Sequence, residues 1–355
     1  MKILSIDQHI SVNADVQHAL NELGHSVTIA SLSGHSAVIR RPQAKIPLLE
    51  GDGWCSIFSE KRVEQFYEQY KEPFSEFDAF LCCYPPIFSM LYERWQKPII
   101  VYMPIRYECG AECNAEMWLE FNEYLRRGVD SGQIILLSNS MYDKKYAEGF
   151  LEREVEHIPS YCDYTGMSFN PIYPQFLYYA AFKLRDPGPK LILKHDALKA
   201  GHAWQDVADF RGCIHFPYNA SLMSIFEQYV SNIPLFFPTK RYLLEMWLNE
   251  VPVVHQICWP ATLGKTPGSI IPHKHEKDPN NYSDFNIISH WLDYADYYYG
   301  EMKHIQYFDN REERNAILEL SDKALFDISS KMREDNVRRK ISILNKWNDV
   351  MKRIA

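Results

Sequence analysis

The chain has 355 residues, of which 46% are hydrophobic and 24% charged, so it is long enough for two ordinary hydrophobic cores. Its 38 basic and 46 acidic residues leave a net charge of −8, which argues against general nucleic-acid binding because that requires a basic surface. No segment is apolar over the roughly 20 residues that a membrane helix needs, and the first apolar segment is too short for a secretory signal, so we expect a cytoplasmic protein without a transmembrane segment.

A strand, a helix and a second strand are expected over 2–6, 15–23 and 26–30, since apolar residues recur on one face of the middle segment. The strands expected after them cover 79–83, 98–102, 133–137 and 155–159, with helices around 60–71, 86–95, 114–128 and 140–149. Such alternation predicts parallel strands joined by right-handed crossovers. We therefore expect a Rossmann-like domain over residues 1–165.

Prolines and glycines interrupt this alternation of strands and helices over 166–189, and we interpret the segment as a linker between two domains. The elements expected next are strands over 190–194, around Cys213 and over 233–237, and helices over 222–230 and 239–249. A polar loop is expected over 259–286, and a helical tail begins near Arg311 and ends in a helix over 336–354. The fold class is therefore α/β, with a second Rossmann-like domain over 190–355 that carries the terminal helices.

The eight cysteines of the chain do not form an evident disulfide or zinc framework. Cys82, Cys83 and Cys213 lie inside predicted strands, which indicates buried thiols. Cys109 and Cys113 are four residues apart, but no second ligand pair follows at a zinc-like spacing. We expect free thiols and no metal site.

Two histidines on the predicted loop over 259–286 offer a further possible metal site. His273 and His275 could share one face of an extended segment, but no further ligand follows them. We interpret this segment as a solvated or donor-covering loop.

The stretch over 212–238 carries the most specific signal for function. It predicts a buried strand, a turn rich in hydroxyl and amide groups, a helix and a second buried strand. A helix N-terminus has unpaired N–H groups and a partial positive charge, which suits an anion such as a diphosphate. Candidate donor-binding residues here are Tyr218, Asn219, Ser221, Ser224 and Glu227. The alternative is that Ser221 is only a helix cap and that Glu227 lies on the solvated face of the helix.

Basic side chains follow several predicted strands, at the edge where open α/β sheets bind ligands. Lys194 could stabilise the charge that develops on a leaving diphosphate, and we assign it a catalytic role. Arg106 and Lys240 are further candidates for donor binding. The alternative for Lys194 is an ordinary surface lysine at the end of a strand.

Asp7 and His9 directly follow the first strand. An inverting transferase needs a base within hydrogen-bond reach of the acceptor hydroxyl, and either side chain could serve. No glycine-rich turn is present here, so we expect no bound dinucleotide. The alternative for both residues is an ordinary polar loop.

Three stretches of the chain resemble nucleotide-sugar glycosyltransferases of the GT-B fold. Met1-Lys2-Ile3-Leu4 and Leu23-Gly24-His25-Ser26-Val27-Thr28 are similar to the first strand and helix of many such enzymes. The stretch from Leu137-Ser138-Asn139-Ser140 to Ile158-Pro159-Ser160 is similar to the end of their acceptor domain.

The third stretch is similar to the donor-site pattern of retaining members, Pro-Ser…Glu-x7-Glu-Ala…Gly-x-Pro-Val. Pro217-Tyr218, Glu227 and Asn232-Ile233-Pro234-Leu235 occupy its frame. The resemblance implies that Glu227 is the glutamate that holds the donor ribose. Asn219 stands where the family has its first glutamate, so the stereochemistry of transfer stays open.

This resemblance implies two Rossmann-like domains facing across a cleft, with the acceptor at the first and the donor at the second. The implied reaction moves a sugar from a nucleotide-sugar donor to the hydroxyl of a glycan or other acceptor, without a metal. No cofactor is expected, because the nucleotide-sugar is a substrate. Alternatives are a nucleotide-sugar epimerase of the same fold, or a non-catalytic carbohydrate- or nucleotide-binding protein.

Overall fold

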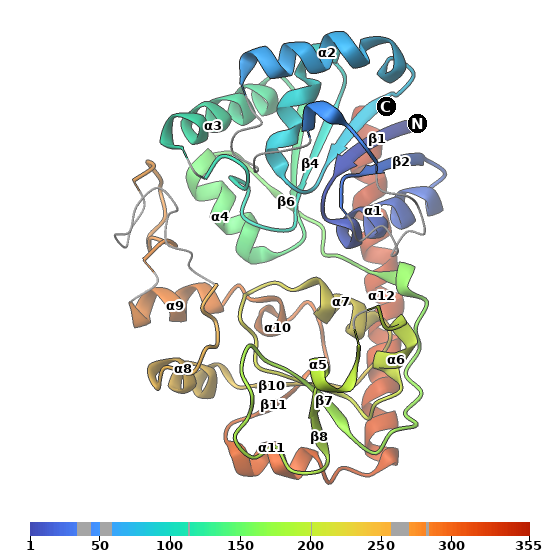
Figure 1. Ribbon diagram of the computed structural model, residues 1–355, viewed down its shortest axis with the longest axis vertical. Helices are drawn as coiled ribbons and strands as arrows, with labels where there is room; N and C mark the ends of the chain where they lie inside the picture. Colours follow the sequence, from blue (N-terminus) through green and yellow to red (C-terminus); the bar gives the residue numbers. More distant parts are fainter. Residues whose placement is uncertain (34–43, 50–58, 113, 200, 257–269, 282–283) are drawn as a thin grey trace. The chain divides into compact units, whose positions relative to one another are not determined.

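Two compact units make up the computed structural model, which describes residues 1–33, 44–49, 59–112, 114–199, 201–256, 270–281 and 284–355 (Figure 1). Unit 1 contains Met1–Ser160, the described residues among 260–280, and Ile343–Ala355. Unit 2 contains the described residues among 161–259 and Asn281–Ser342. Each unit is built on one parallel sheet, of six strands in unit 1 and five in unit 2. The predicted α/β class with two Rossmann-like sheets is confirmed.

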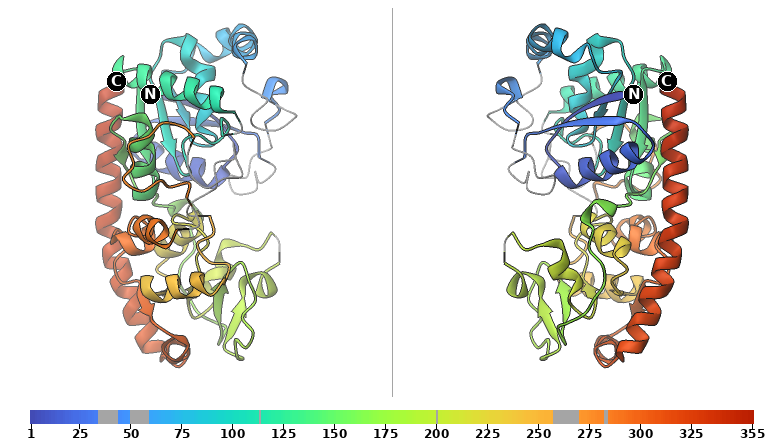
Figure 2. Two further views of the ribbon diagram at one scale, coloured as in Figure 1. Left: turned by 90° about the vertical axis from the view of Figure 1, so that its left-hand side faces the viewer. Right: turned by 90° about the vertical axis from the view of Figure 1, so that its right-hand side faces the viewer.

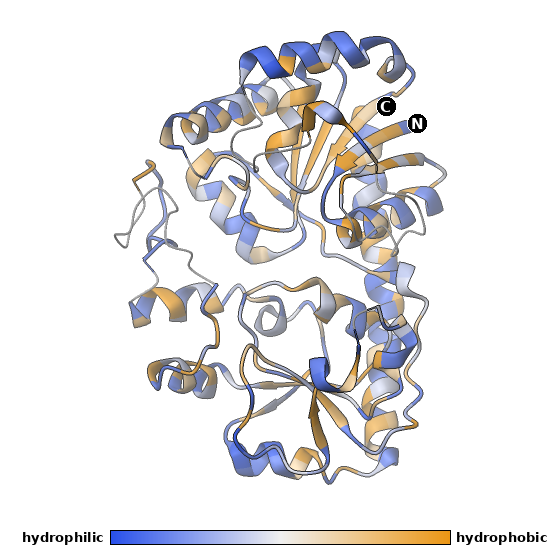
Figure 3. Ribbon diagram, viewed as in Figure 1, coloured by the Kyte–Doolittle hydropathy of each residue, from blue (hydrophilic) through white to orange (hydrophobic). Residues whose placement is uncertain are grey.

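The sheet of unit 1 has the strand order β2-β1-β3-β4-β5-β6. Its strands are β1 (Lys2–Asp7), β2 (Ser26–Ser31), β3 (Ala79–Cys82), β4 (Ile99–Met103), β5 (Ile134–Ser138) and β6 (Glu156–His157). Every residue of β3 and β4 is buried, which explains why both are continuous apolar runs (Figure 3). The order reverses between β1 and β3, since β2 pairs on the other side of β1.

Three of the helices described in unit 1, α2 (Glu60–Phe74), α3 (Ala115–Asp130) and α4 (Met141–Leu151), begin after a residue whose side chain caps them. The other described helices of this unit are α1 (Ile10–Glu22), η2 (Pro47–Leu49) and η4 (Pro86–Trp95). Ser59, Asn114 and Ser140 each accept backbone N–H groups of the helix that follows. The predicted helix over 86–95 is a 3₁₀ helix whose N-cap is Pro85 and whose first residue is Pro86, neither of which has an N–H donor.

The sheet of unit 2 has the strand order β11-β10-β9-β7-β8. Its strands are β7 (Phe176–Tyr179), β8 (Leu191–Leu193), β9 (Cys213–His215), β10 (Leu235–Pro238) and β11 (Gln306–Phe308). β7 lies inside the segment 166–189 that the sequence indicated as a linker, yet it is the strand between β8 and β9. This short apolar run has prolines on both sides, so the sequence indicated a linker there and not a strand. The strand is stabilised by pairing with β8 and β9.

The helices of unit 2 are short apart from the last one. They are η5 (Asp163–Thr165), α5 (Lys194–Ala197), α6 (Trp204–Ala208), α7 (Met223–Val230), α8 (Lys240–Leu248), α9 (Phe285–Leu292), α10 (Asp296–Tyr299), α11 (Arg311–Ile317) and α12 (Asp322–Ile354). α12 is one unbroken helix of 33 residues, where the sequence indicated a separate final helix over 336–354 (Figure 2).

The end of α12 belongs to unit 1, although the predicted second domain ran to residue 355. Trp347 is 2% exposed, and its ring meets Tyr102 of β4 edge-on with centroids 5.3 Å apart. Arg353 pairs with Glu156 of β6 at 2.5 Å. The predicted second domain, 190–355, does not match the compact units because the chain returns at its end to a sheet that it left nearly 200 residues earlier.

The predicted buried thiols are confirmed for Cys82, Cys83 and Cys213, which are free and buried. Cys109 is also a buried free thiol, and Cys113 lies outside the described residues. No helix within the described ranges is both long and apolar enough to span a bilayer. Within the predicted loop over 259–286, the described residues 270–281 contain no helix or strand, but Phe285 and Asn286 begin α9, so the loop ends earlier than predicted.

Candidate functional site

The strand order of unit 2 reverses at β7, which has β8 on one side and β9 on the other. Tyr178 pairs with Leu193 across one interface and with Ile214 across the other. Loops that leave the carboxyl ends of two such strands turn in opposite directions and open a crevice, which is where open α/β sheets bind ligands. The segments after β7, β8 and β9 all start at this edge, including Lys194 and the turn over 216–222.

Four stacked aromatic rings run across the strands at this edge. The centroid distance is 4.7 Å from Tyr179 to His215 and 4.7 Å from His215 to Phe237. Phe237 stacks in turn on Tyr297, with centroids 4.9 Å apart and the planes within 10°. Burial lowers the pKa of His215 to about 4, while its hydrogen bond to Gln228 at 2.7 Å opposes the shift. His215 is therefore neutral at physiological pH, and the row acts as a rigid apolar wall.

Glu227 of α7 lies on the buried side of its helix and not on a solvated face. Its exposed fraction is 6%, and its Oε1 accepts a hydrogen bond of 2.5 Å from the hydroxyl of Tyr164. Burial lowers the pKa of Lys194, and the charge of Glu227 opposes that shift. The charge of Glu227 therefore acts on Lys194, although 33 residues separate the two in the sequence.

The predicted turn before α7 has its backbone held by its own side chains and neighbours. Asn219 Oδ1 accepts the N–H of Ala220 at 2.8 Å, and the hydroxyl of Tyr297 donates to the carbonyl of Asn219 at 3.1 Å. The N-cap of α7 is Leu222, which makes no side-chain capping bond, so Ser221 is not the cap that the alternative interpretation expected. Ser221 and Ser224 are half-buried, and Tyr218 is 37% exposed.

Two basic residues predicted for the donor site have other partners. Lys240 is the first residue of α8, and its Nζ lies 2.6 Å from Asp293 Oδ1. Arg106 belongs to unit 1, where it is 5% exposed and its Nε donates to Glu108 Oε1 at 2.6 Å. Its guanidinium also lies 4.6 Å from the ring centre of Tyr146. Sequence reasoning did not predict that Glu108, two residues further on, pairs with Arg106.

Asp7 and His9 lie at the reversal point of the sheet of unit 1, between β1 and β3. Asp7 is 0% exposed, and its carboxylate accepts the N–H groups of His9 at 2.5 Å, Cys83 at 3.1 Å and Tyr84 at 2.6 Å. Burial raises the pKa of Asp7 to about 7, although these hydrogen bonds oppose the shift. His9 is half-buried, with its ring edge-on to Tyr84 at 5.7 Å. Of the two predicted bases, His9 is the one whose side chain reaches solvent.

The histidines of the predicted loop pack against α4 and are not fully solvated. The His273 and His275 rings lie 5.2 and 5.0 Å from that of Phe150. Gly149 makes room for them, since a Cβ there would lie 2.0 Å from the His275 ring. Across the described ranges, no three His, Cys, Asp or Glu side chains converge in a way that could hold a metal ion.

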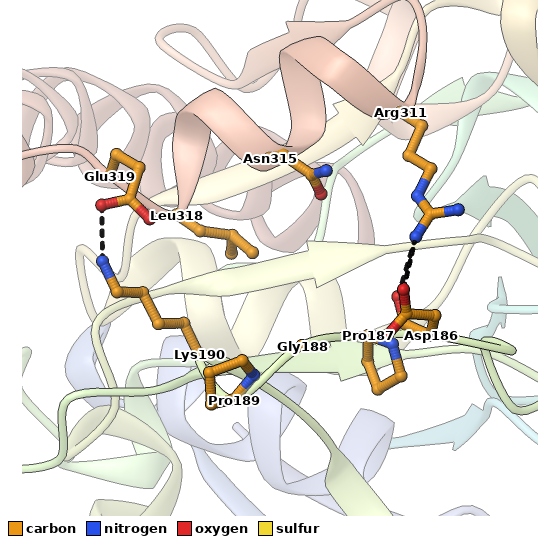
Figure 4. Close-up of a pocket in the computed structure, with 9 residues that line it drawn as sticks. All are labelled: Asp186, Pro187, Gly188, Pro189, Lys190, Arg311, Asn315, Leu318 and Glu319. Atoms are coloured by element: carbon orange, nitrogen blue, oxygen red, sulfur yellow. Dashed lines mark hydrogen bonds and ion pairs between the residues drawn. The ribbon is translucent and has the colours of Figure 1, made fainter.

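A surface hollow of unit 2 lies between the segment 186–190 and α11, with a volume of about 270 Å³ (Figure 4). Two ion pairs cross it, Arg311 to Asp186 at 2.9 Å and Lys190 to Glu319 at 2.5 Å. None of the predicted site residues lines it, so we assign it no part in the candidate site.

Sequence reasoning missed Tyr164, Tyr179 and His215 as parts of this edge. His215 is an isolated polar residue inside an apolar strand, and this contrast could have indicated a candidate site residue. Tyr164 carried no signal, because its partner Glu227 lies 63 residues further along the chain.

Comparison with known proteins finds likeness in structure and none in sequence. No family model matches the chain, and no curated protein matches it either. The chain is similar to the solved structure of the glycotransferase of kitacinnamycin, with a TM-score of 0.47, 11% identity, and 100% of this chain and 98% of that chain covered. It is similar to the glycosyltransferase SnogD from Streptomyces nogalater, with a TM-score of 0.45, 9% identity and 99% of each chain covered. A putative UDP-N-acetylglucosamine 2-epimerase from Listeria monocytogenes has a TM-score of 0.42 and 11% identity, over 70% of this chain and 82% of that chain.

Proposed function

We propose that this chain is a glycosyltransferase that moves a sugar from a nucleotide-sugar donor to an acceptor hydroxyl. The observation that carries the proposal is the buried carboxylate of Glu227 on α7, 6% exposed, whose charge acts on Lys194 at the end of β8. A nucleoside diphosphate needs an acceptor for its ribose hydroxyls and a positive group for its phosphates, and these two side chains supply both. We assign donor binding to unit 2 and acceptor binding to unit 1.

The N-terminus of α7 supports a role in phosphate binding. The N-cap Leu222 makes no side-chain capping bond, and the helix dipole favours negative charge at this end of the helix. In the proposed complex, Tyr218, Asn219, Ser221 and Ser224 surround the donor. Lys194 stabilises the charge that the diphosphate gains as the glycosidic bond breaks.

His9 is the proposed base if transfer inverts the anomeric carbon. Its imidazole takes the proton of the acceptor hydroxyl while the oxygen attacks that carbon, and the diphosphate leaves with the bonding electrons. Asp7 is fully buried and accepts the backbone N–H of His9, so we assign it the task of holding the loop. If transfer retains the configuration, catalysis depends on Lys194 and the N-terminus of α7. The proposed reaction uses no metal ion.

The first experiment is a thermal-shift screen of the full chain against nucleoside diphosphates and their sugar conjugates, with and without EDTA. A ligand at about 100 times its dissociation constant adds ~2.7 kcal/mol of stability, which is readily detected. A chelator-insensitive shift with one nucleotide series would support the proposal and identify the donor. The absence of a shift with every nucleotide would contradict it.

The donor identified in this way is then incubated with a panel of hydroxyl acceptors, and products are identified by mass spectrometry. A glycosylated acceptor is the expected product. Conversion of the donor to an isomeric sugar without acceptor would instead indicate an epimerase. Nucleotide binding without turnover under any condition would indicate a non-catalytic binding protein.

A further inference from the structure

The hydrogen bond between Tyr164 and Glu227 joins two parts of unit 2 that are distant in sequence. Tyr164 lies in η5, and Glu227 lies on the second turn of α7. The phenol oxygen is 2.5 Å from Glu227 Oε1, a length typical of strong bonds from a hydroxyl to a charged oxygen. Because Glu227 is only 6% exposed, this bond has little competition from water.

The backbone that carries Tyr164 is fixed on both sides. Cys162 and Gly166 flank η5 with left-handed φ angles of 66° and 62°, so the chain turns sharply before and after the tyrosine. Asp163 pairs with Lys340 of α12 at 3.2 Å, which attaches the turn to a long helix. These contacts give the phenol a defined position before any ligand arrives.

The ring of Tyr164 is also supported from the side. It meets Trp204 of α6 edge-on, with centroids 6.1 Å apart and planes at 79°. At the other end of the bond, the hydroxyl of Ser231 donates to the carbonyl of Glu227 at 2.7 Å, which braces the last turn of α7. Both partners of the bond are therefore held by groups other than each other.

A hydroxyl bound to one carboxylate oxygen selects the orientation of the whole carboxylate. Tyr164 donates one hydrogen, whereas an ionised carboxylate has about four acceptor positions, so the bond orients Glu227 without saturating it. We propose that Tyr164 is a positioning residue that aims Glu227 at the ribose hydroxyls of the donor. This inference rests on the proposed donor site and adds to it a residue that determines recognition of the ribose.

The test compares the wild type with Tyr164→Phe, which removes the hydroxyl and keeps the ring. Calorimetry measures binding of the nucleoside diphosphate found in the screen, and of its 2′,3′-dideoxy analogue. Tyr164→Phe should bind the ribonucleotide about tenfold more weakly, equivalent to ~1.4 kcal/mol, and should bind the dideoxy analogue as the wild type does. Combining Tyr164→Phe with Glu227→Gln should weaken binding no further than Glu227→Gln alone.

The matched control is Tyr173→Phe, which removes a hydroxyl from a tyrosine of the same unit that is 47% exposed and packs against Phe210. It should leave both affinities unchanged. Unchanged ribonucleotide affinity in Tyr164→Phe, or equal losses for the two nucleotides, would overturn the inference while leaving the donor site intact. If the wild type binds no nucleotide, the proposed function itself fails, and the inference fails with it.

Discussion

Two buried carboxylates, one in each unit, have opposite surroundings. Asp7 of unit 1 is the last residue of β1, Glu227 of unit 2 lies on α7, the helix that follows β9, and both are buried. Asp7 accepts three backbone N–H groups from the loops after β1 and β3. Glu227 instead accepts a tyrosine hydroxyl and interacts with a lysine.

The difference shows how to separate a structural carboxylate from a ligand-binding one. Backbone N–H groups cannot move away without changing the loop, so the bonds of Asp7 fix the local fold. Glu227 instead accepts a hydrogen bond from a side chain, Tyr164, which is itself held by its turn and by Trp204. We therefore expect the loss of Asp7 to reduce stability and the loss of Glu227 to reduce binding.

The largest expected effect concerns His9, which Asp7 holds in place through a backbone bond. His9→Gln should lower the rate of transfer by roughly 10²–10⁴-fold, because general-base catalysis contributes on that scale. Donor affinity should not change, since the donor site is assigned to unit 2. Steady-state kinetics and calorimetry with the donor check both statements, with His18→Gln on the same helix as the control. Full activity in the His9 variant would remove it from the mechanism.

The second effect is on folding. Asp7→Ala should lower the free energy of unfolding by about 3 kcal/mol or more, because three N–H groups lose their acceptor and each buried unpaired group costs roughly 1–3 kcal/mol. Urea denaturation followed by circular dichroism measures the change. The control is Asp78→Ala, which removes an exposed carboxylate that accepts a single N–H from Lys2. Similar stabilities for the two variants would refute the structural role of Asp7.

The third effect is on donor binding. Glu227→Gln should weaken the affinity for the nucleoside diphosphate by about 10–100-fold, since a hydrogen bond to a charged group contributes roughly 1.5–3 kcal/mol. The melting temperature without ligand should change little. Glu245→Gln, an exposed residue on α8 of the same unit, is the control. Equal affinities of folded Glu227→Gln and the wild type for the nucleoside diphosphate would contradict the assignment of Glu227 to the donor site.

The smallest effect, counted per pH unit, is a pH dependence of the stability of unit 1. Burial raises the pKa of Asp143 to about 7, against the hydrogen bond that Ser140 donates at 2.6 Å. A folded-state pKa above the unfolded value means that the folded chain binds the proton more tightly. The contribution of protonated Asp143 to the free energy of unfolding is therefore complete below about pH 4, and it is lost as the pH rises through 7. The difference in unfolding free energy between the wild type and Asp143→Asn should fall by up to ~1.4 kcal/mol per pH unit across that range.

The control for the pH experiment is Asp130→Asn in the same unit. Asp130 is exposed, and its hydrogen bonds with Arg153 lower its pKa. The contribution of ionised Asp130 to the free energy of unfolding is therefore lost only below about pH 4. The difference between the wild type and this variant should stay flat from pH 4.5 to 7.5. A flat profile for Asp143→Asn as well would show that this carboxyl is ionised throughout.

Much of the fold was readable from local patterns. Continuous apolar runs predicted β3 and β4, because strands that are buried on both faces carry apolar side chains on both faces. Alternation of these runs with helical segments predicted parallel sheets. β7 escaped prediction because its four residues lie between prolines, and only pairing with β8 and β9 makes it an inner strand of the sheet.

The chain by itself determined the order of strands and helices and the presence of polar residues after β1, β8 and β9, because hydrophobic period and turn chemistry are local properties. It also singled out Glu227 as a lone carboxylate in an apolar helix. Only the tertiary structure decided that Glu227 accepts a hydrogen bond from Tyr164, that Arg106 is bound by Glu108, and that the end of α12 joins unit 1. These outcomes depend on which strands become neighbours, and strand order is fixed by packing between segments that are far apart in the sequence.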